Sequence, residues 1–228
     1  MLKPLKEWIH LLFDADNIPK KIICRVDGGS VSGLSFGHVS RCLVMAANIR
    51  DIYACDILFL MRNYEEGIRY IAKQGWPVVE INTNAGIEEE LRLLKKILSD
   101  NKPDWLIVDL PYKEVDDFYF MQLKDSVTKI MFIDDCRFIN PDVDVIINSS
   151  ILAKKRIVVP AESSARYFIG PEYFIFDNYY KENVLATKKN YLNVLLTFGG
   201  SDPTDIMNQV LGVLLKEKMD KIVFKVIL

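Results

Sequence analysis

One segment of the chain joins a glycine-rich loop to a titratable imidazole. An apolar run ends at Asp27, and a second apolar-periodic stretch opens at His38. A turn that leads from a strand into a helix places backbone N–H groups and the positive helix end beside an anionic ligand. The segment therefore predicts an anion cradle that also carries a histidine. Its candidate residues are Asp27, Gly28, Gly29, Gly37, His38 and Arg41.

Acidic residues close two further apolar runs. Asp109 ends one of them, and the pair Asp134 and Asp135 ends the next. Ligands of open α/β sheets collect outside the carboxyl ends of the strands, so these side chains are expected at the same edge as Asp27. Acidic pairs can hold Mg²⁺, but we prefer a role in shaping the cleft and holding substrate.

Short Val- and Ile-rich runs alternate with stretches of helical period, which is typical of a parallel sheet with crossover helices. The predicted strands are Lys21–Val26, Asp56–Met61, Pro77–Ile81, Asp104–Leu110, Lys129–Ile133 and Val143–Asn148. The predicted helices are His38–Arg50, Tyr64–Gln74, Gly86–Ser99 and Glu114–Ser126. The pattern predicts an α/β fold, a Rossmann-type doubly wound domain over residues 21–170, preceded by a helical extension over residues 1–20.

After Gly170 the alternation lapses, and we interpret residues 171–190 as a linker. A second alternation covers residues 191–228, with strands Tyr191–Thr197 and Lys221–Leu228 around a helix Asp205–Lys218. A β-α-β unit of about 40 residues buries too little surface to be stable alone. We therefore expect either a truncated second Rossmann-like domain or its completion by self-association or a second chain.

The composition narrows the class of protein. The 228 residues carry a formal net charge of −2, which disfavours broad binding to nucleic acid or anionic membranes. Four cysteines without a C-x-x-C pair indicate buried thiols and a cytoplasmic location. We expect no membrane span. Residues 5–13 predict an amphipathic helix, with docking on a membrane surface as the alternative.

Several motifs follow one another in order: R-V-D-G-G, F-G-H-V-S-R-C-L-V-M-A, V-D-L, F-I-D-D-C-R, D-V-I-I-N, G-P-E-Y and L-L-T-F-G-G-S-D-P. Over about residues 21 to 205 the chain thereby resembles the UDP-sugar hydrolases of pseudaminic acid biosynthesis and their spore-coat polysaccharide relatives. That family has a two-domain GT-B architecture, similar to the enzyme that adds N-acetylglucosamine in peptidoglycan assembly. In this chain the loop before His38 is two residues longer than is usual, and Ser35 replaces a glycine.

The resemblance implies hydrolysis of a UDP-linked 2,4-diacetamido-2,4,6-trideoxy sugar by attack of water at the anomeric carbon, with neither metal nor cofactor. It implies that His38 is the catalytic general base or positions the water. A helix N-terminus favours the neutral imidazole that can accept a proton. The alternative is that His38 only caps its helix.

Each of the other candidate residues has two possible roles. Asp27 either accepts hydrogen bonds from the sugar or ties down the glycine loop. Arg41 either offers planar donors to a diphosphate or is an ordinary exposed arginine. Arg137 either contacts substrate or neutralises the acidic pair at Asp135. Asn148 and Tyr173 are substrate contacts by resemblance, with a turn and core packing as the alternatives.

A second loop repeats the strand-loop-helix pattern. Its glycines allow close backbone approach to phosphate, although no Lys-Ser/Thr pair follows as in a P-loop. A tight turn without ligand is the alternative. The residues predicted to bind the nucleotide phosphates are Gly199, Gly200, Ser201 and Asp202.

Three functions remain open from the sequence. The first is a nucleotide-sugar hydrolase, or the N-terminal part of one, with a UDP-sugar as its partner. The second is a GT-B glycosyltransferase that passes the sugar to an acceptor. The third is a noncatalytic binding or assembly partner.

Overall fold

A computed structural model describes residues 5–13, 18–31, 33–134, 138–176, 190–198, 202, 205–217 and 221–227. Its main unit is a seven-stranded sheet in the order β3-β2-β1-β4-β5-β6-β7. Every neighbouring pair of strands in this sheet is parallel. The strands are β1 (Lys21–Val26), β2 (Asp56–Arg62), β3 (Val78–Ile81), β4 (Trp105–Asp109), β5 (Lys129–Ile133), β6 (Val145–Asn148) and β7 (Arg166–Ile169).

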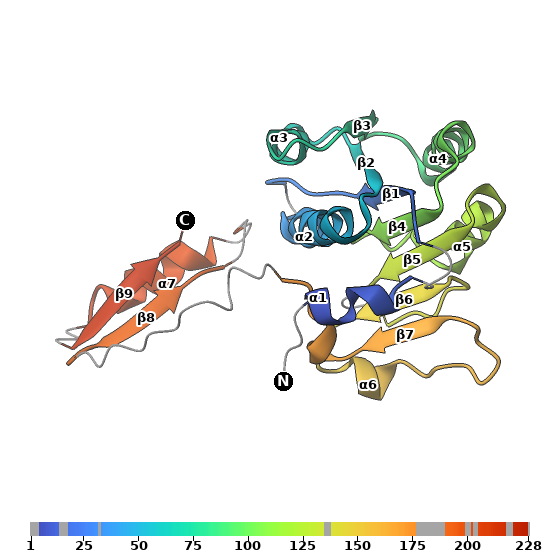
Figure 1. The fold of residues 1–228 in the computed structure, drawn as a ribbon. Coiled ribbons are helices and arrows are strands. Elements are labelled where there is room, and N and C mark those ends of the chain that lie inside the picture. Colours follow the sequence, from blue (N-terminus) through green and yellow to red (C-terminus); the bar gives the residue numbers. More distant parts are fainter. Residues whose placement is uncertain are drawn as a thin grey trace.

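Helices cover both faces of this sheet (Figure 1). Side chains of α2 and α3 share one apolar cluster with α1, while α4 and α5 pack into a second cluster on the opposite face. The predicted doubly wound α/β class is therefore confirmed. The helices are α2 (Gly37–Tyr53), α3 (Glu65–Lys73), α4 (Ile87–Asn101), α5 (Asp117–Leu123) and α6 (Ala153–Arg156), with a 3-10 turn at Lys124–Ser126.

The departures from the sequence prediction include the start of one helix and the presence of one strand. The predicted helix Glu114–Ser126 begins only at Asp117, because the carboxylate of Asp116 accepts the backbone N–H of Tyr119 and caps the helix there. Strand β7 was not predicted. Its four residues contain two polar positions, so the edge strand lacks the apolar run that identifies the inner strands.

The N-terminal segment is a short helix α1 (Leu5–Trp8) followed by a 3-10 turn, Ile9–Leu11, instead of one continuous helix. Leu5, Trp8 and Ile9 are almost fully buried in the same cluster as α2. Because this apolar face already packs in the core, it is not the exposed face that the membrane-docking alternative required. Among the described residues, no helix has the length and apolar character to cross a membrane.

The expected linker begins inside the first unit. A 3-10 turn, Pro171–Tyr173, follows β7, and Ile175 is buried in the cluster around α2. Residues 171–176 of the expected linker therefore pack on the first unit. Residues 177–189 lie outside the described part of the chain.

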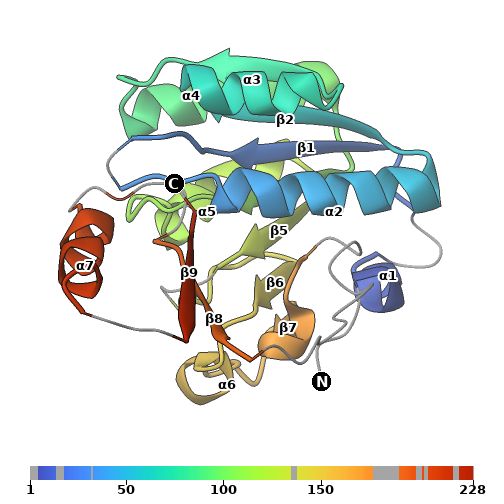
Figure 2. The ribbon, with the colours of Figure 1, turned by 90° about the vertical axis from the view of Figure 1, so that its left-hand side faces the viewer.

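The second unit forms a sheet of its own. Strands β8 (Leu192–Leu196) and β9 (Ile222–Val226) pair in parallel, with α7 (Ile206–Leu214) between them in sequence. This is the β-α-β unit predicted from the second alternation. Figure 2 views the main sheet from the side of α2, the helix that carries the candidate site.

Candidate functional site

The strand order places the candidate site at a reversal in the sheet. Strands β1 and β4 are neighbours, and the chain proceeds from β1 to one side and from β4 to the other. Open α/β sheets have a crevice at the carboxyl ends of two such strands. In the register of this pair, Val26 lies opposite Asp109, so the glycine loop and Asp109 leave the sheet together.

Helix α2 directs three donors at Asp109. His38, Arg41 and Cys42 are spaced i, i+3 and i+4 and therefore share one face of the helix. His38 Nδ1 lies 2.7 Å from Asp109 Oδ1, and Arg41 binds both carboxylate oxygens through Nε and Nη2. The Cys42 thiol donates to Asp109 Oδ2 at 3.6 Å. The sequence did not predict this convergence of His38, Arg41 and Asp109.

Asp109 is completely buried yet ionised. Burial alone would raise the pKa of Asp109, but the Arg41 guanidinium and the hydrogen bond from His38 hold it below its usual value. An ionised carboxylate only accepts hydrogen bonds. Nδ1 also lies 3.0 Å from Arg41 Nη2, which can only donate, but the Asp109 carboxylate is the closer partner at 2.7 Å. We therefore assign the His38 proton to Nδ1, which leaves the lone pair of a neutral imidazole on Nε2.

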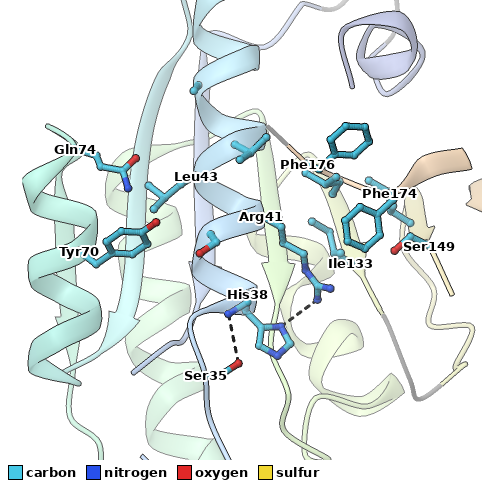
Figure 3. A pocket seen from close by; sticks show the side chains of 16 residues that line it. Ser35, His38, Arg41, Leu43, Tyr70, Gln74, Ile133, Ser149, Phe174 and Phe176 are labelled. Atoms are coloured by element: carbon cyan, nitrogen blue, oxygen red, sulfur yellow. Dashed lines mark hydrogen bonds between the residues drawn. The ribbon is translucent and has the colours of Figure 1, made fainter. Parts of the chain in front are cut away.

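His38 and Arg41 open onto a cavity of about 550 Å³. Figure 3 shows both side chains projecting from α2, with Tyr70 of α3 on one side and Phe174 on the other. His38 and Arg41 are 15% and 17% exposed, whereas the carboxylate that they bind has no exposed surface. None of the described residues lining the cavity is acidic, and Gly37 and Ser35 line the mouth near His38. Such a cavity does not repel an anionic ligand.

Asp27 lies on the other face of the sheet, in a buried ion network. Both of its oxygens accept from Arg25, and Oδ1 also accepts the backbone N–H of Arg62 at 2.7 Å. Arg25 and Arg62 in turn bind Glu90 of α4, which also accepts from Tyr119. With no exposed surface and these partners, Asp27 has no oxygen directed at a ligand. These contacts match the alternative in which Asp27 ties down the glycine loop.

Two glycines allow α2 and α3 to pack directly on the loop. A Cβ at Gly28 would lie 2.5 Å from Val39 Cγ2, beside His38 on α2. A Cβ at Gly67 of α3 would lie 2.1 Å from the carbonyl oxygen of Gly28. A Cβ at Gly29 would lie 3.2 Å from Tyr64 Cβ, a tight but milder contact. The glycines therefore fix the entry to α2, and with it the position of His38.

The remaining residues predicted in the first unit are placed as follows. Asn148 is buried, donates to Asp134 at 3.1 Å, and accepts the backbone N–H of Ser150. The Tyr173 ring packs against Trp8 and Phe168, outside the cavity. These contacts match the turn and packing alternatives. Asp135 and Arg137 lie outside the described residues, and within the described ranges no group of His, Cys, Asp or Glu side chains is arranged to hold a metal ion.

The second loop is only partly described. Asp202 accepts the backbone N–H groups of Ile206 and Met207 and so caps α7. Its carboxylate therefore occupies the helix end that a phosphate would otherwise use. Gly199, Gly200 and Ser201 lie outside the described residues.

No family model matches the chain. The chain is 31% identical over 208 residues to an uncharacterised protein, MJ1062, of Methanocaldococcus jannaschii, with 88% of this chain and 41% of that protein covered. It is 29% identical over 205 residues to the UDP-2,4-diacetamido-2,4,6-trideoxy-beta-L-altropyranose hydrolase of Campylobacter jejuni, with 87% of this chain and 67% of the hydrolase covered. The chain thus spans about two fifths of one relative and two thirds of the other.

Among solved structures, the chain resembles Acinetobacter baumannii MurG with a TM-score of 0.51 at 11% identity. The match covers 92% of this chain and 66% of MurG. MurG is a GT-B glycosyltransferase, so the GT-B-like, Rossmann-type fold expected from the sequence is confirmed. The comparisons together support a relationship to nucleotide-sugar enzymes.

The roles of Cys42, Arg25 and Glu90 were not predicted from the sequence. The spacing of Cys42 from His38, one helical turn, was a usable signal. An arginine at position 25, within an otherwise apolar strand, was another, because a buried guanidinium requires carboxylate partners. Nothing local indicates that one partner is Glu90, 65 residues away.

Proposed function

We propose that this chain carries the catalytic half of a nucleotide-sugar hydrolase that cleaves a UDP-linked diacetamido-trideoxy sugar into UDP and the free sugar. The observation that carries the proposal is the His38–Asp109 pair, buried on one side and open on the other to a cavity at the reversal of the sheet. The hydrolase name of the Campylobacter jejuni relative supports the choice of substrate. The proposed setting is cytoplasmic synthesis of a surface polysaccharide or nonulosonic acid.

In the proposed reaction His38 Nε2 takes a proton from water while the water oxygen bonds to the anomeric carbon. The bond from that carbon to the phosphate oxygen breaks, and its electron pair leaves with UDP. Asp109 orients the imidazole and stabilises the imidazolium that forms, as the carboxylate does in other His–Asp pairs. Arg41 holds Asp109 in place through two parallel hydrogen bonds.

In this proposal the second unit binds the nucleotide. The backbone N–H groups of Gly199, Gly200 and Ser201 would bind the diphosphate, because glycines permit close backbone approach. Arg41 is committed to Asp109, so we assign it to the positioning of the carboxylate and not primarily to phosphate binding. The substrate would then lie with its sugar at His38 and its phosphates toward the second loop.

The test is UDP release from the UDP-linked diacetamido-trideoxy sugar by the 228-residue chain. We expect His38→Ala to lower the rate about 100-fold or more, the usual contribution of a general base. His10→Ala is the matched control, because His10 is exposed in the N-terminal 3-10 turn. In H₂¹⁸O the label should enter the sugar and not UDP. Equal rates for His38→Ala and wild type, or label in UDP, would contradict the proposal.

The same assay separates the other two functions. UDP release that requires an added acceptor sugar would identify a glycosyltransferase. Binding of the UDP-sugar without any release of UDP would identify a noncatalytic partner.

A further inference from the structure

The Asp109 carboxylate receives a fourth donor that the proposed reaction does not use. His38 and Arg41 supply three hydrogen bonds from the side of the cavity. The Cys42 thiol supplies the fourth, to Oδ2, from the side of the core. A carboxylate offers about four lone-pair positions, so Cys42 completes its coordination.

Cys42 cannot act through direct contact with a ligand. Its side chain is 1% exposed, lies in the apolar cluster beneath α2, and is absent from the lining of the cavity. Burial, and then the charge of Asp109, raise the pKa of the Cys42 thiol, so that it keeps its proton and remains a donor. Any influence on His38 must therefore pass through Asp109.

We propose that Cys42 is a positioning residue that fixes the plane of the Asp109 carboxylate and limits the negative charge available to His38. This inference rests on the proposed role of the His38–Asp109 pair. Without the thiol, Oδ2 is held by Arg41 alone, and the carboxylate directs more of its charge toward the imidazole. Hydrogen bonds that stabilise a carboxylate compete in this way with a neighbouring cation.

The experiment is an NMR titration of the His38 imidazole in the 228-residue chain. The chain has two histidines, so His10→Ala assigns the signals. The described titratable groups around the imidazole and its carboxylate partner are Asp109 itself on β4, Arg41 and Cys42 on α2, and Cys24 on β1. Cys42→Ala should raise the His38 midpoint by about half a pH unit, because the charged imidazole gains from the less satisfied carboxylate.

Three further variants distinguish this role from general packing. Cys42→Val fills the space without a donor and should raise the midpoint as Cys42→Ala does. Cys42→Ser restores a donor and should return the midpoint toward the wild-type value. Cys24→Ala removes a thiol that is equally buried on β1 but for which the structure gives no hydrogen bond to Asp109, and should leave the midpoint unchanged.

An unchanged midpoint in both Cys42→Ala and Cys42→Val would overturn the proposal, as would an equal shift in Cys24→Ala. The readout does not depend on turnover, so it can succeed even if no UDP is released. Where turnover is measured, Cys42→Ala should lower kcat with KM unchanged, since Cys42 does not contact substrate. A rise in KM alone would contradict a role through Asp109.

Discussion

Two buried aspartates follow neighbouring strands of one sheet, and the structure uses them differently. Asp27 follows β1 and faces the helices α4 and α5, where Arg25 and a backbone N–H enclose it. Asp109 ends β4 and faces α2, where His38 connects it to a cavity. Both carboxylates have no exposed surface. What separates them is the kind of partner, because Arg62 beside Asp27 is as exposed as His38 beside Asp109, but only the imidazole can take up and release a proton.

A carboxylate at the end of a strand is therefore not by itself evidence of a functional site. Side chains alternate between the faces of a strand, so two acidic residues at the same edge can serve separate environments. The network around Asp27 holds the glycine loop and the first turn of α4 together. The pair at Asp109 can move a proton because His38 reaches the solvent.

We expect the largest effect from a substitution in the buried ion network around Asp27. Glu90→Gln removes the charge that Arg25 and Arg62 share. Removing one member of a buried ion network costs about 3–5 kcal/mol, and we expect the free energy of unfolding to fall by that amount in chemical denaturation. Asp100→Asn, in an exposed pair with Lys96, is the control and should leave it nearly unchanged. Similar losses in both variants would refute a structural network.

A second variant disturbs the contact between the glycine loop and helix α2. Gly28→Ala places a methyl group 2.5 Å from Val39 and should displace the start of α2, lowering stability by about 1–3 kcal/mol. Because His38 is the neighbour of Val39, we also expect kcat for UDP release to fall. Gly86→Ala is matched, since a Cβ there meets open space. The idea fails if both alanine variants behave alike in unfolding and turnover.

A third variant tests whether Arg41 positions Asp109 or binds the diphosphate. Arg41→Lys keeps a positive charge but cannot bind both oxygens of Asp109 in a fixed plane. We expect kcat to fall about tenfold, a loss of about 1.4 kcal/mol in transition-state stabilisation, with KM little changed. If KM rises instead and kcat is retained, Arg41 binds the diphosphate directly and Asp109 is held by other groups.

The smallest effect is on stability in acid. Burial would raise the pKa of Asp109 and of Glu90, but their arginine partners hold both pKa values below the usual range. Their contribution to stability is therefore complete above about pH 5, and it is lost as the pH falls through about 4 toward the folded pKa values. Urea unfolding between pH 7 and pH 3 should show this loss, and Glu90→Gln should reduce it. A pH-independent unfolding free energy would contradict both ion networks.

Much of the fold could be predicted because the inner strands are buried on both faces. The run Lys129–Ile133 is apolar after its first residue and is bounded by polar residues, so its ends agree with the structure. The edge strand Arg166–Ile169 escaped prediction because one side of it faces no other strand and its sequence is mixed. Burial of Ile175 was missed because the apolar run Phe174–Phe176 is too short to show the periodicity of a helix or a strand.

The candidate site could be predicted only in part. The sequence identified His38 at a helix start and Asp109 at a strand end as candidates. Their pairing spans 71 positions and depends on the strand order, so it was not predictable. The separation of Asp27 from the cavity depends on which face of β1 it occupies. Both faces of that strand are buried, so hydrophobic alternation does not distinguish them.

The most direct test of the account compares Asp109→Asn with Asp27→Asn in one assay. UDP release per folded molecule is measured for both, with the folded fraction taken from circular dichroism. We expect a loss of about 1000-fold for Asp109→Asn, since the His38 proton is no longer held by a carboxylate. We expect Asp27→Asn to be less stable but, per folded molecule, to stay within about threefold of wild type. Equal losses in the two variants, or a greater loss in Asp27→Asn, would contradict these expectations.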